Sequence, residues 1–142
     1  MEILFSKAPS SVPAAPADLR WLNVDELPVY NRHLALCGQK PIATDQWRRI
    51  ITEGTLYCGL FADGEMVARA AVEKYSEDRW EVADVRTARK YRNLGCAKQT
   101  CLFVMSYIFR HGRTATIRTE ADNESMLSVI RSLGFEKIAA EE

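Results

Sequence analysis

The clearest chemical signal in the sequence is a turn that leads into an amphipathic stretch. It comprises Arg92-Asn93-Leu94-Gly95-Cys96-Ala97. Gly95 leaves the backbone free of a side chain that would block close approach, and Ala97 keeps the first helical turn slim. The first amides of a helix have no acceptor within the helix, and the positive end of the helix dipole lies beside them. The pattern predicts a phosphate-binding turn, although a single glycine is weak evidence without support from the flanking residues.

Two carboxylates lie on the apolar stretch before this turn and are candidates for acid–base chemistry. Residues 80–87 read Trp-Glu-Val-Ala-Asp-Val-Arg-Thr, a pattern typical of a strand. Strict alternation of side chains gives one face with Glu81, Ala83 and Val85 and another with Trp80, Val82 and Asp84. From a regular strand, only one of Glu81 and Asp84 can therefore point into a given cleft.

The patterns around the turn predict an α/β fold built on one sheet. Strands are expected at residues 19–22, 55–62, 66–73, 80–87, 114–119 and 135–139, and helices at 23–36, 44–53, 94–111 and 124–133. Asp63-Gly64 is a strong hairpin signal between two of these strands. The connection from strand 80–87 through helix 94–111 to strand 114–119 is long enough for a parallel crossover. We therefore predict a mixed, mostly antiparallel sheet with a central parallel pair and helices on both faces.

The predicted helices carry further expectations. Asn23 or Asp25 should cap the first helix. His33 and His111 should face solvent or lie at helix ends. An apolar stripe of the helix 94–111 should pack on the sheet, made of Leu94, Ala97, Cys101, Met105 and Ile108.

Size and composition limit the class of protein. The chain has 142 residues, of which 47% are hydrophobic, and this suits one domain (residues 18–142) preceded by a strand and linker (residues 1–17). The formal net charge is zero, so no general affinity for nucleic acid or for an anionic membrane is expected. The four cysteines form no CxxC pair and no His/Cys cluster, so we expect no metal site and a reducing cytoplasm. The sequence shows no signal-peptide pattern and no apolar run of membrane-spanning length.

Residues 55–135 resemble the GCN5-related N-acetyltransferase (GNAT) family in two linked motifs. Arg86–Ala97 is similar to the family's Y-T-x-x-x-Y-R-G-x-G-Y-A type of signature, and Arg92–Ala97 fits its pyrophosphate pattern, Gln/Arg-x-x-Gly-x-Gly/Ala. About 26 residues after Gly95, Asp122-Asn123 opens a stretch that ends in Leu133-Gly134-Phe135 and looks like the family's second motif. The two motifs at this separation are far more specific than either alone.

The resemblance implies that the parallel pair of strands splays and that acetyl-CoA, the co-substrate, lies in the V-shaped gap. The pantetheine arm would pair with the backbone of residues 83–87 as an added strand. The amides of residues 93–98 would hold the pyrophosphate. Asn123 would touch the pantetheine or the strand end, or serve only as a helix cap. The cofactor-binding residues implied are Val85, Arg86, Thr87, Arg92, Asn93, Leu94, Gly95, Cys96, Ala97, Lys98 and Asn123.

The resemblance also implies direct transfer of an acetyl group to a primary amine of a small molecule or peptide. Glu81 would take a proton from the acceptor ammonium, directly or through water, with Asp84 as the alternative base. A backbone N–H near Val85 would polarise the thioester carbonyl. A non-catalytic acyl-CoA-binding regulatory or interaction module on the same fold is the alternative function. Acceptor specificity would come from residues 23–54, whose mixed charges favour neither acidic nor basic acceptors.

The sequence departs from the family's pattern in two places. Many members have a tyrosine in the last helix that protonates the leaving thiolate, and counting back from Leu133-Gly134-Phe135 places Ile130 there. Ser128, Tyr91 or water would have to take this role, or the thiolate leaves without a protein acid. Only one strand follows the tripeptide where the family has two, and either Ile3–Phe5 or a partner subunit in a homodimer could complete the edge.

Overall fold

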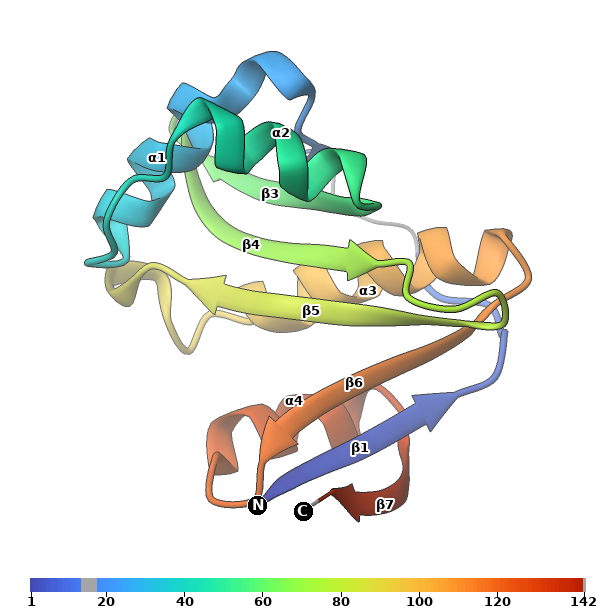
Figure 1. Ribbon diagram of the computed structural model, residues 1–142. Helices are drawn as coiled ribbons and strands as arrows, with labels where there is room; N and C mark the ends of the chain where they lie inside the picture. Colours follow the sequence, from blue (N-terminus) through green and yellow to red (C-terminus); the bar gives the residue numbers. More distant parts are fainter. Residues whose placement is uncertain (14–17, 142) are drawn as a thin grey trace.

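The computed structural model describes residues 1–13 and 18–141, so residues 14–17 of the expected linker lie outside the described part (Figure 1). The strands are β1 (Glu2–Lys7), β2 (Leu19–Trp21), β3 (Thr55–Ala62), β4 (Glu65–Glu73), β5 (Arg79–Thr87), β6 (Thr114–Glu120) and β7 (Glu136–Glu141). The helices are α1 (Leu27–Leu36), α2 (Thr44–Thr52), α3 (Cys96–Arg110) and α4 (Glu124–Ser132), with 3-10 turns η1 (Val24–Glu26) and η2 (Arg89–Tyr91). The predicted order of strands and helices is confirmed, including the hairpin at Asp63-Gly64.

The strands form one mixed sheet in the order β2-β3-β4-β5-β6-β1-β7. Its only parallel neighbours among the described strands are β5 and β6, and every other registered pair is antiparallel. The crossover through α3 connects this parallel pair, because a parallel connection must return the chain to the same end of the sheet. The predicted fold class is therefore confirmed.

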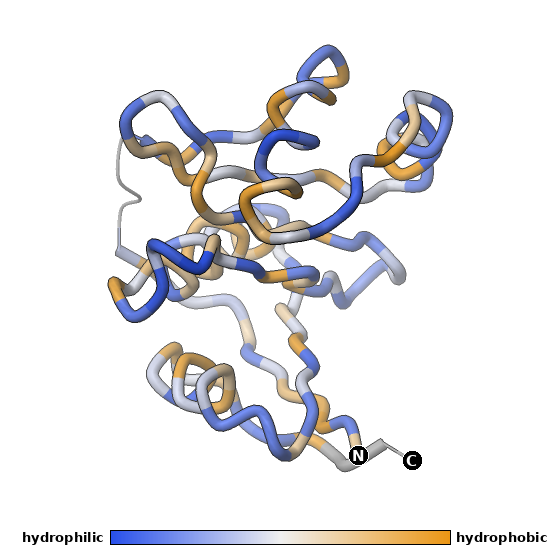
Figure 2. Tube along the Cα trace, turned by 90° about the vertical axis from the view of Figure 1, so that its left-hand side faces the viewer, coloured by the Kyte–Doolittle hydropathy of each residue, from blue (hydrophilic) through white to orange (hydrophobic). Residues whose placement is uncertain are grey.

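Helices cover both faces of the sheet. Helices α1 and α2 cover one face, where Tyr30, Trp47 and Tyr57 are buried together in what we call the α1-side core. Helix α3 covers the other face, where Val104, Met105 and other residues form the α3-side core with Leu127 of α4. In Figure 2 the helical coils alternate between hydrophilic and hydrophobic segments, as expected of helices with one face on a sheet.

Strands β5 and β6 pair at one end and then separate. Their register covers three residue pairs, from Arg79↔Thr114 to Glu81↔Thr116. Beyond these pairs β5 runs on to Thr87, whereas β6 continues beside β1. Figure 1 shows the two strands diverging from their paired ends. The predicted splay is confirmed, and it leaves the β6-facing edge of β5 beyond Glu81 without a partner strand in the described part of the chain.

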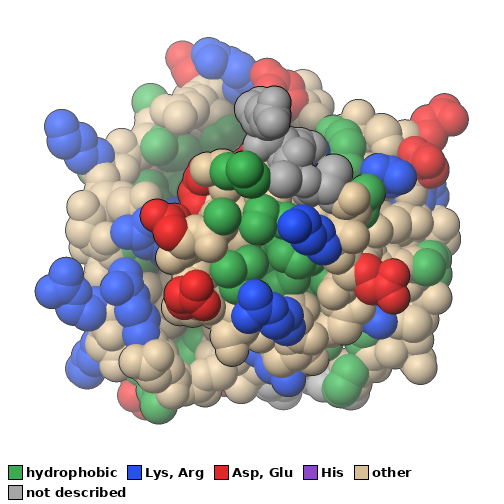
Figure 3. Space-filling model, turned by 90° about the horizontal axis from the view of Figure 1, so that it is seen from below, with side chains coloured by type: hydrophobic (Ala, Val, Ile, Leu, Met, Phe, Trp, Pro, Cys, Tyr) green, Lys and Arg blue, Asp and Glu red, His purple; other side chains and the backbone are tan. Residues whose placement is uncertain are grey.

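Strand β1 lies between β6 and β7, antiparallel to both. Of the two ways in which the short C-terminal edge could be completed, the structure thus shows the one from within the chain. Phe5 of β1 is 6% exposed and belongs to the α3-side core. Figure 3 shows the molecule from below, on the side of β1 and β7, with a hydrophobic patch bordered by charged side chains of both signs. This face has no uniformly basic character.

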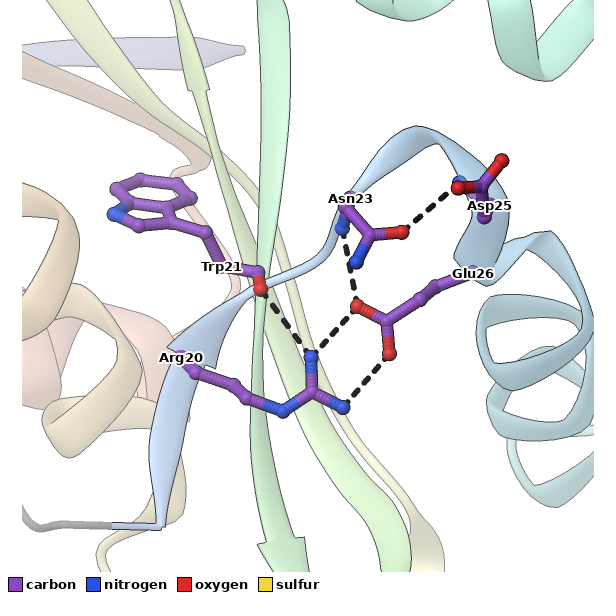
Figure 4. Close-up of polar contacts among 5 residues, drawn as sticks. All are labelled: Arg20, Trp21, Asn23, Asp25 and Glu26. Atoms are coloured by element: carbon purple, nitrogen blue, oxygen red, sulfur yellow. Dashed lines mark hydrogen bonds and ion pairs between the residues drawn. The ribbon is translucent and has the colours of Figure 1, made fainter.

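The entry into α1 is fixed by a capping box (Figure 4). The side chain of Asn23 accepts a hydrogen bond from the Asp25 N–H, and the Asn23 N–H donates to Glu26. The Arg20 guanidinium donates to both carboxylate oxygens of Glu26 at 2.7 Å, and this hydrogen bonding lowers the pKa of Glu26. Of the two predicted caps, Asn23 is the one that the structure uses, and it caps the short turn η1 that leads into the helix.

One expectation about a side chain was wrong. Leu94 does not belong to the buried stripe of α3, because the helix begins at Cys96 after Gly95 in the left-handed region, and Leu94 is 65% exposed.

His33 lies at a helix end, one of the two places expected for it, but not in solvent. It is in the last turn of α1 and is fully buried against β4, where its Nδ1 bonds to the carbonyl oxygen of Met66 at 3.0 Å.

Candidate functional site

A groove of about 730 Å³ opens where β5 leaves β6. The end of β5, the turn after it, the start of α3 and the start of α4 form its walls. Its lining residues are Val85, Arg86, Thr87, Tyr91, Arg92, Asn93, Gly95, Cys96, Ala97, Lys98, Asn123, Ser125, Met126, Ser128 and Val129. The structure therefore brings together every residue predicted to bind the cofactor except Leu94.

The turn at one end of the groove enters α3 through a left-handed backbone. Asn93 and Gly95 both have positive φ, 64° and 82°, and α3 begins directly after Gly95. A Cβ added to Gly95 would meet no atom within 4 Å. Glycine is needed here for its backbone conformation and for open approach to the turn, not because a neighbouring group crowds it.

This turn is tied to the strand before it. The Arg92 Nε donates to the carbonyl oxygen of Thr87 at 3.3 Å, and the Ala88 N–H donates to the carbonyl oxygen of Val67 on β4 at 2.8 Å. The start of α3 is therefore held at a fixed place relative to β5. The first N–H groups of α3, from Cys96 to Lys98, have no acceptor four residues earlier within the helix.

The charge of the groove suits an anionic ligand. Among its described lining residues, Arg86, Arg92 and Lys98 are cationic and none carries a carboxylate. The free amides and the positive end of the α3 dipole add to this field. The residues present therefore fit the diphosphate of a coenzyme A thioester, and the unpartnered edge of β5 offers backbone groups to its pantetheine arm.

The structure adds groove residues that the sequence pattern did not predict to bind. Ser125, Met126 and Val129 of α4 line the groove beside Asn123, whose side chain also accepts a hydrogen bond from the Met126 N–H as a helix cap. The 3.6-residue period of a helix that starts at Asn123 could have indicated this face.

The two residues considered as proton donors both line the groove, namely Tyr91 and Ser128. Ile130, at the position where many family members have tyrosine, is fully buried in the α3-side core. A side chain at that position faces the core, so α4 places the Ser128 hydroxyl, and no phenol, on the groove.

Cys96 packs beneath the turn. Its thiol donates to the carbonyl oxygen of Tyr91 at 3.6 Å and its side chain is 8% exposed. Burial raises the pKa of Cys96. The residue therefore packs as a small apolar side chain and does not act as a reactive thiolate.

Glu81 lies at the point where β5 and β6 separate. Its Oε1 accepts from Arg118 Nε at 2.9 Å and from Thr116 Oγ1 at 3.4 Å. Glu73 of β4 is paired directly with Glu81 in the sheet. Burial and the charges of Glu81 and Asp84 raise the pKa of Glu73, which makes it a further candidate base. Sequence reasoning missed Glu73 because its position opposite Glu81 depends on the register of β4 with β5.

Asp84 does not lie where strict alternation put it. Between the pairs Arg69↔Arg86 and Ala71↔Ala83, β4 has one residue and β5 has two, Asp84 and Val85. This β-bulge shifts the alternation. Val85 consequently packs with the α3-side core, whereas Asp84 contacts Arg69 and Tyr57 toward the α1 side. The prediction that Glu81 and Val85 share one face and that Asp84 lies on the other was therefore wrong.

Comparison with family models identifies the class of protein. The model of the acetyltransferase (GNAT) family matches residues 18–135. The chain belongs to this family of acyltransferases. Comparison of the sequence with curated proteins gave no match.

Solved structures show the same fold. A protein described as an acetyltransferase of the GNAT family from Novosphingobium aromaticivorans is 23% identical, with a TM-score of 0.77, over 96% of this chain and 60% of its own. A GNAT-family acetyltransferase from Colwellia psychrerythraea is 15% identical, with a TM-score of 0.77, over 96% of this chain and 52% of its own. The chain therefore spans between half and two thirds of the length of these two proteins.

A third similar structure contains a coenzyme A derivative. AAC(6')-Iy, solved in complex with the bisubstrate analogue CoA-S-monomethyl-acetylneamine, is 18% identical, with a TM-score of 0.70, over 88% of this chain and 94% of its own. At such identities the likeness concerns the fold. In the described residues of the present chain, no helix has the length and apolar character needed to cross a membrane.

Proposed function

We propose that this chain transfers the acetyl group of acetyl-CoA directly to a primary amine of a small molecule or peptide. The observation that carries the proposal is that one groove joins the unpaired end of β5, the turn at Arg92–Gly95 and Asn123. Family membership and the fold support acetyl transfer in general. The reaction would use groups that line the groove and groups on the adjoining part of the sheet.

Binding of acetyl-CoA would use the backbone first. The amides of Asn93 to Lys98 would hold the diphosphate, with Arg92 and Lys98 adding charge. The backbone of Ala83–Thr87 would pair with the pantetheine arm and so align the thioester along β5. A backbone N–H near Val85 would donate to the thioester carbonyl and stabilise the negative charge that develops on its oxygen.

Glu81 is the proposed general base. It would accept a proton from the acceptor ammonium, directly or through water, so that the neutral nitrogen can form a bond to the acetyl carbon. The bond between that carbon and sulfur then breaks. The nitrogen loses its second proton as the amide forms, and this proton replaces the one that the thiolate takes from the Ser128 hydroxyl, the Tyr91 phenol or water. Arg118 holds the Glu81 carboxylate at the apex of the splayed strands.

One observation favours a second function of a different class. Position 130 holds a buried isoleucine where many family members have tyrosine, so it offers no proton donor to the groove. A non-catalytic acyl-CoA-binding module would retain the groove and need no proton donor. Turnover with any amine separates the two functions.

The first test is thermal unfolding of the protein with and without excess acetyl-CoA, followed by release of CoA thiol in the presence of a panel of amines. A ligand at a hundredfold over its Kd adds about 2.7 kcal/mol of stability. Stabilisation with turnover supports the enzyme, and stabilisation without turnover supports the binding module. Absence of stabilisation would rule out both.

The proposal also includes the cytoplasmic location and the homodimer that the sequence analysis considered. Cys37, Cys58, Cys96 and Cys101 are all free thiols, which supports a reducing compartment such as the cytoplasm. Molecular mass in solution would test for a homodimer.

A further inference from the structure

The β-bulge in β5 forces Asp84 into an unusual backbone conformation. Its φ is 47°, in the left-handed region that L residues rarely adopt. The bulge stands between the part of β5 that pairs with β6 and the part that lines the groove. A non-glycine residue persists in this conformation only where its surroundings hold it.

Three hydrogen bonds hold the Asp84 carboxylate. Arg69 donates from Nη2 to Oδ1 at 3.0 Å and from Nε to Oδ2 at 3.2 Å. The Tyr57 hydroxyl donates to Oδ2 at 2.7 Å. Arg69 comes from β4, the neighbour of β5, and Tyr57 comes from β3, the next strand beyond it, so the contact ties the bulge to β4 and β3. We call this set of three residues the bulge clamp.

The donors of the bulge clamp are themselves fixed. Arg69 is 2% exposed although it is charged, and its Nη1 donates to the Gln39 side chain at 2.9 Å. Burial tends to lower the pKa of Arg69, but the hydrogen bond and charge of Asp84 outweigh it and the pKa is raised. Burial and the Asp84 charge raise the pKa of Tyr57, so its phenol stays protonated and donates. Each of the three guanidinium nitrogens of Arg69 donates to a partner, so the buried group is a rigid support.

We propose that Arg69 and Tyr57 are positioning residues that hold Asp84, and with it the bulged backbone at Asp84–Val85, in the orientation that serves the thioester carbonyl. The inference rests on the proposed function and extends it to residues outside the groove. It also gives Asp84 a role other than the base. Both carboxylate oxygens are engaged by the clamp, and taking up a proton would disrupt its ion pair with a buried guanidinium.

The experiment compares kcat and KM of Arg69→Met, Arg69→Lys, Tyr57→Phe and Asp84→Asn with wild type. Removing one donor to a developing oxyanion lowers kcat by about 100-fold or more. We expect a loss of this order in Arg69→Met, partial recovery in Arg69→Lys, and a loss of about tenfold in Tyr57→Phe, since one hydrogen bond is removed. Asp84→Asn should lower kcat while the shape of the pH profile of kcat/KM is retained.

Arg20→Gln is the matched control. Arg20 also forms a two-pronged pair with a carboxylate, but on the surface and away from the groove. It should leave kcat unchanged. Wild-type kcat in Arg69→Met would overturn the inference and leave the proposed function intact. Loss of the low-pH limb of the profile in Asp84→Asn would also overturn it, because that result makes Asp84 the base.

A second measurement needs no substrate. The backbone amide resonances of Asp84 and Val85 report the bulge directly by NMR. We expect both to shift in Arg69→Met and Tyr57→Phe and to stay in place in Arg20→Gln. Unchanged resonances would overturn the clamp even if the activity fell. A wild type without turnover would refute the proposed function and the catalytic role of the clamp, while this measurement would still decide whether the clamp holds the bulge.

Discussion

Arg118 of β6 donates to Glu81 of β5 at 2.9 Å, across the apex where the two strands separate. Glu81 is the last residue of β5 in register with β6, and Arg118 lies two residues beyond the last paired residue of β6. The ion pair therefore spans the start of the gap. Glu81 is 14% exposed at its side chain, so its carboxylate is held in one place beside the site where acetyl transfer is proposed.

Replacing Glu81 by Gln should lower kcat/KM by about 100-fold to 10,000-fold, the range typical of a lost general base. Glutamine keeps the shape and can still accept from Arg118, but it cannot take a proton at working pH. The loss should be largest at low pH, where less of the amine is neutral, and should decrease as pH rises. Initial rates against pH with a turnover-supporting amine provide the measurement.

Glu73→Gln is the paired comparison for this variant, because Glu73 is the neighbour of Glu81 in the sheet. If Glu73→Gln shows the large loss and Glu81→Gln does not, the base is Glu73 and the assignment of Glu81 is wrong.

Gly95→Glu should abolish acetyl-CoA binding in a folded protein. The new carboxylate would extend into the groove beside the amides that are proposed to hold the diphosphate, since no chain atom lies within 4 Å of a Cβ there. Calorimetric titration with acetyl-CoA measures the effect. Gly112→Glu is the matched control: Gly112 also has a positive φ, 71°, with open space around its Cβ, but it follows the other end of α3. Retained binding in folded Gly95→Glu would contradict the placement of the phosphate site.

The sequence allowed prediction of those parts of the fold and site that depend on local signals. The hairpin at Asp63-Gly64 and the crossover around residues 94–111 follow from turn chemistry and periodicity, and they place the turn before α3. The residues predicted to bind the cofactor lie on short segments next to such signals, so the motif could place them along one groove. Helix α3 begins at Cys96, two residues after the predicted start at residue 94, because Gly95 adopts a left-handed conformation that ends the turn. Hydrophobic spacing alone does not show such a backbone conformation.

The features that were missed depend on contacts between distant segments. The bulge at Asp84 is held by Arg69 and Tyr57, 15 and 27 residues earlier, so alternation along β5 could not reveal it. Glu73 became a candidate base only once the register across the turn between β4 and β5 was known. His33 lies at a helix end, one of its two expected places, but its burial against β4 depends on how α1 packs on the sheet.

His33 should make the protein sensitive to mild acid. Burial, opposed by the hydrogen bond to Met66, lowers the pKa of His33 from 6.5 to about 4. As pH falls, the unfolded chain takes up the proton before the folded one does, so the His33 contribution to the free energy of unfolding is constant above about pH 6.5 and decreases between pH 6.5 and 4. The difference amounts to at most about 3 kcal/mol.

His33→Gln should reduce this decrease, measured as the free energy of unfolding in urea at several pH values from 7 to 4. Its lower stability at pH 7 is expected, because glutamine fits the buried site less well. His111→Gln is the control, since His111 is an exposed residue at the end of α3. An unchanged slope with pH in His33→Gln would show that other groups cause the acid sensitivity.

Restoring tyrosine at position 130 should not restore a proton donor. Ile130 is 0% exposed within the α3-side core, and a larger, polar side chain there must displace its neighbours. Overpacking of this kind costs about 1–3 kcal/mol. We therefore expect Ile130→Tyr to lower the free energy of unfolding in urea and to leave kcat at or below the wild-type value. Ile130→Val is the control for packing alone, with a cost of about 0.5–1.5 kcal/mol and unchanged kcat. A stable Ile130→Tyr protein with raised kcat would contradict the orientation of α4 and would place the missing acid at this position.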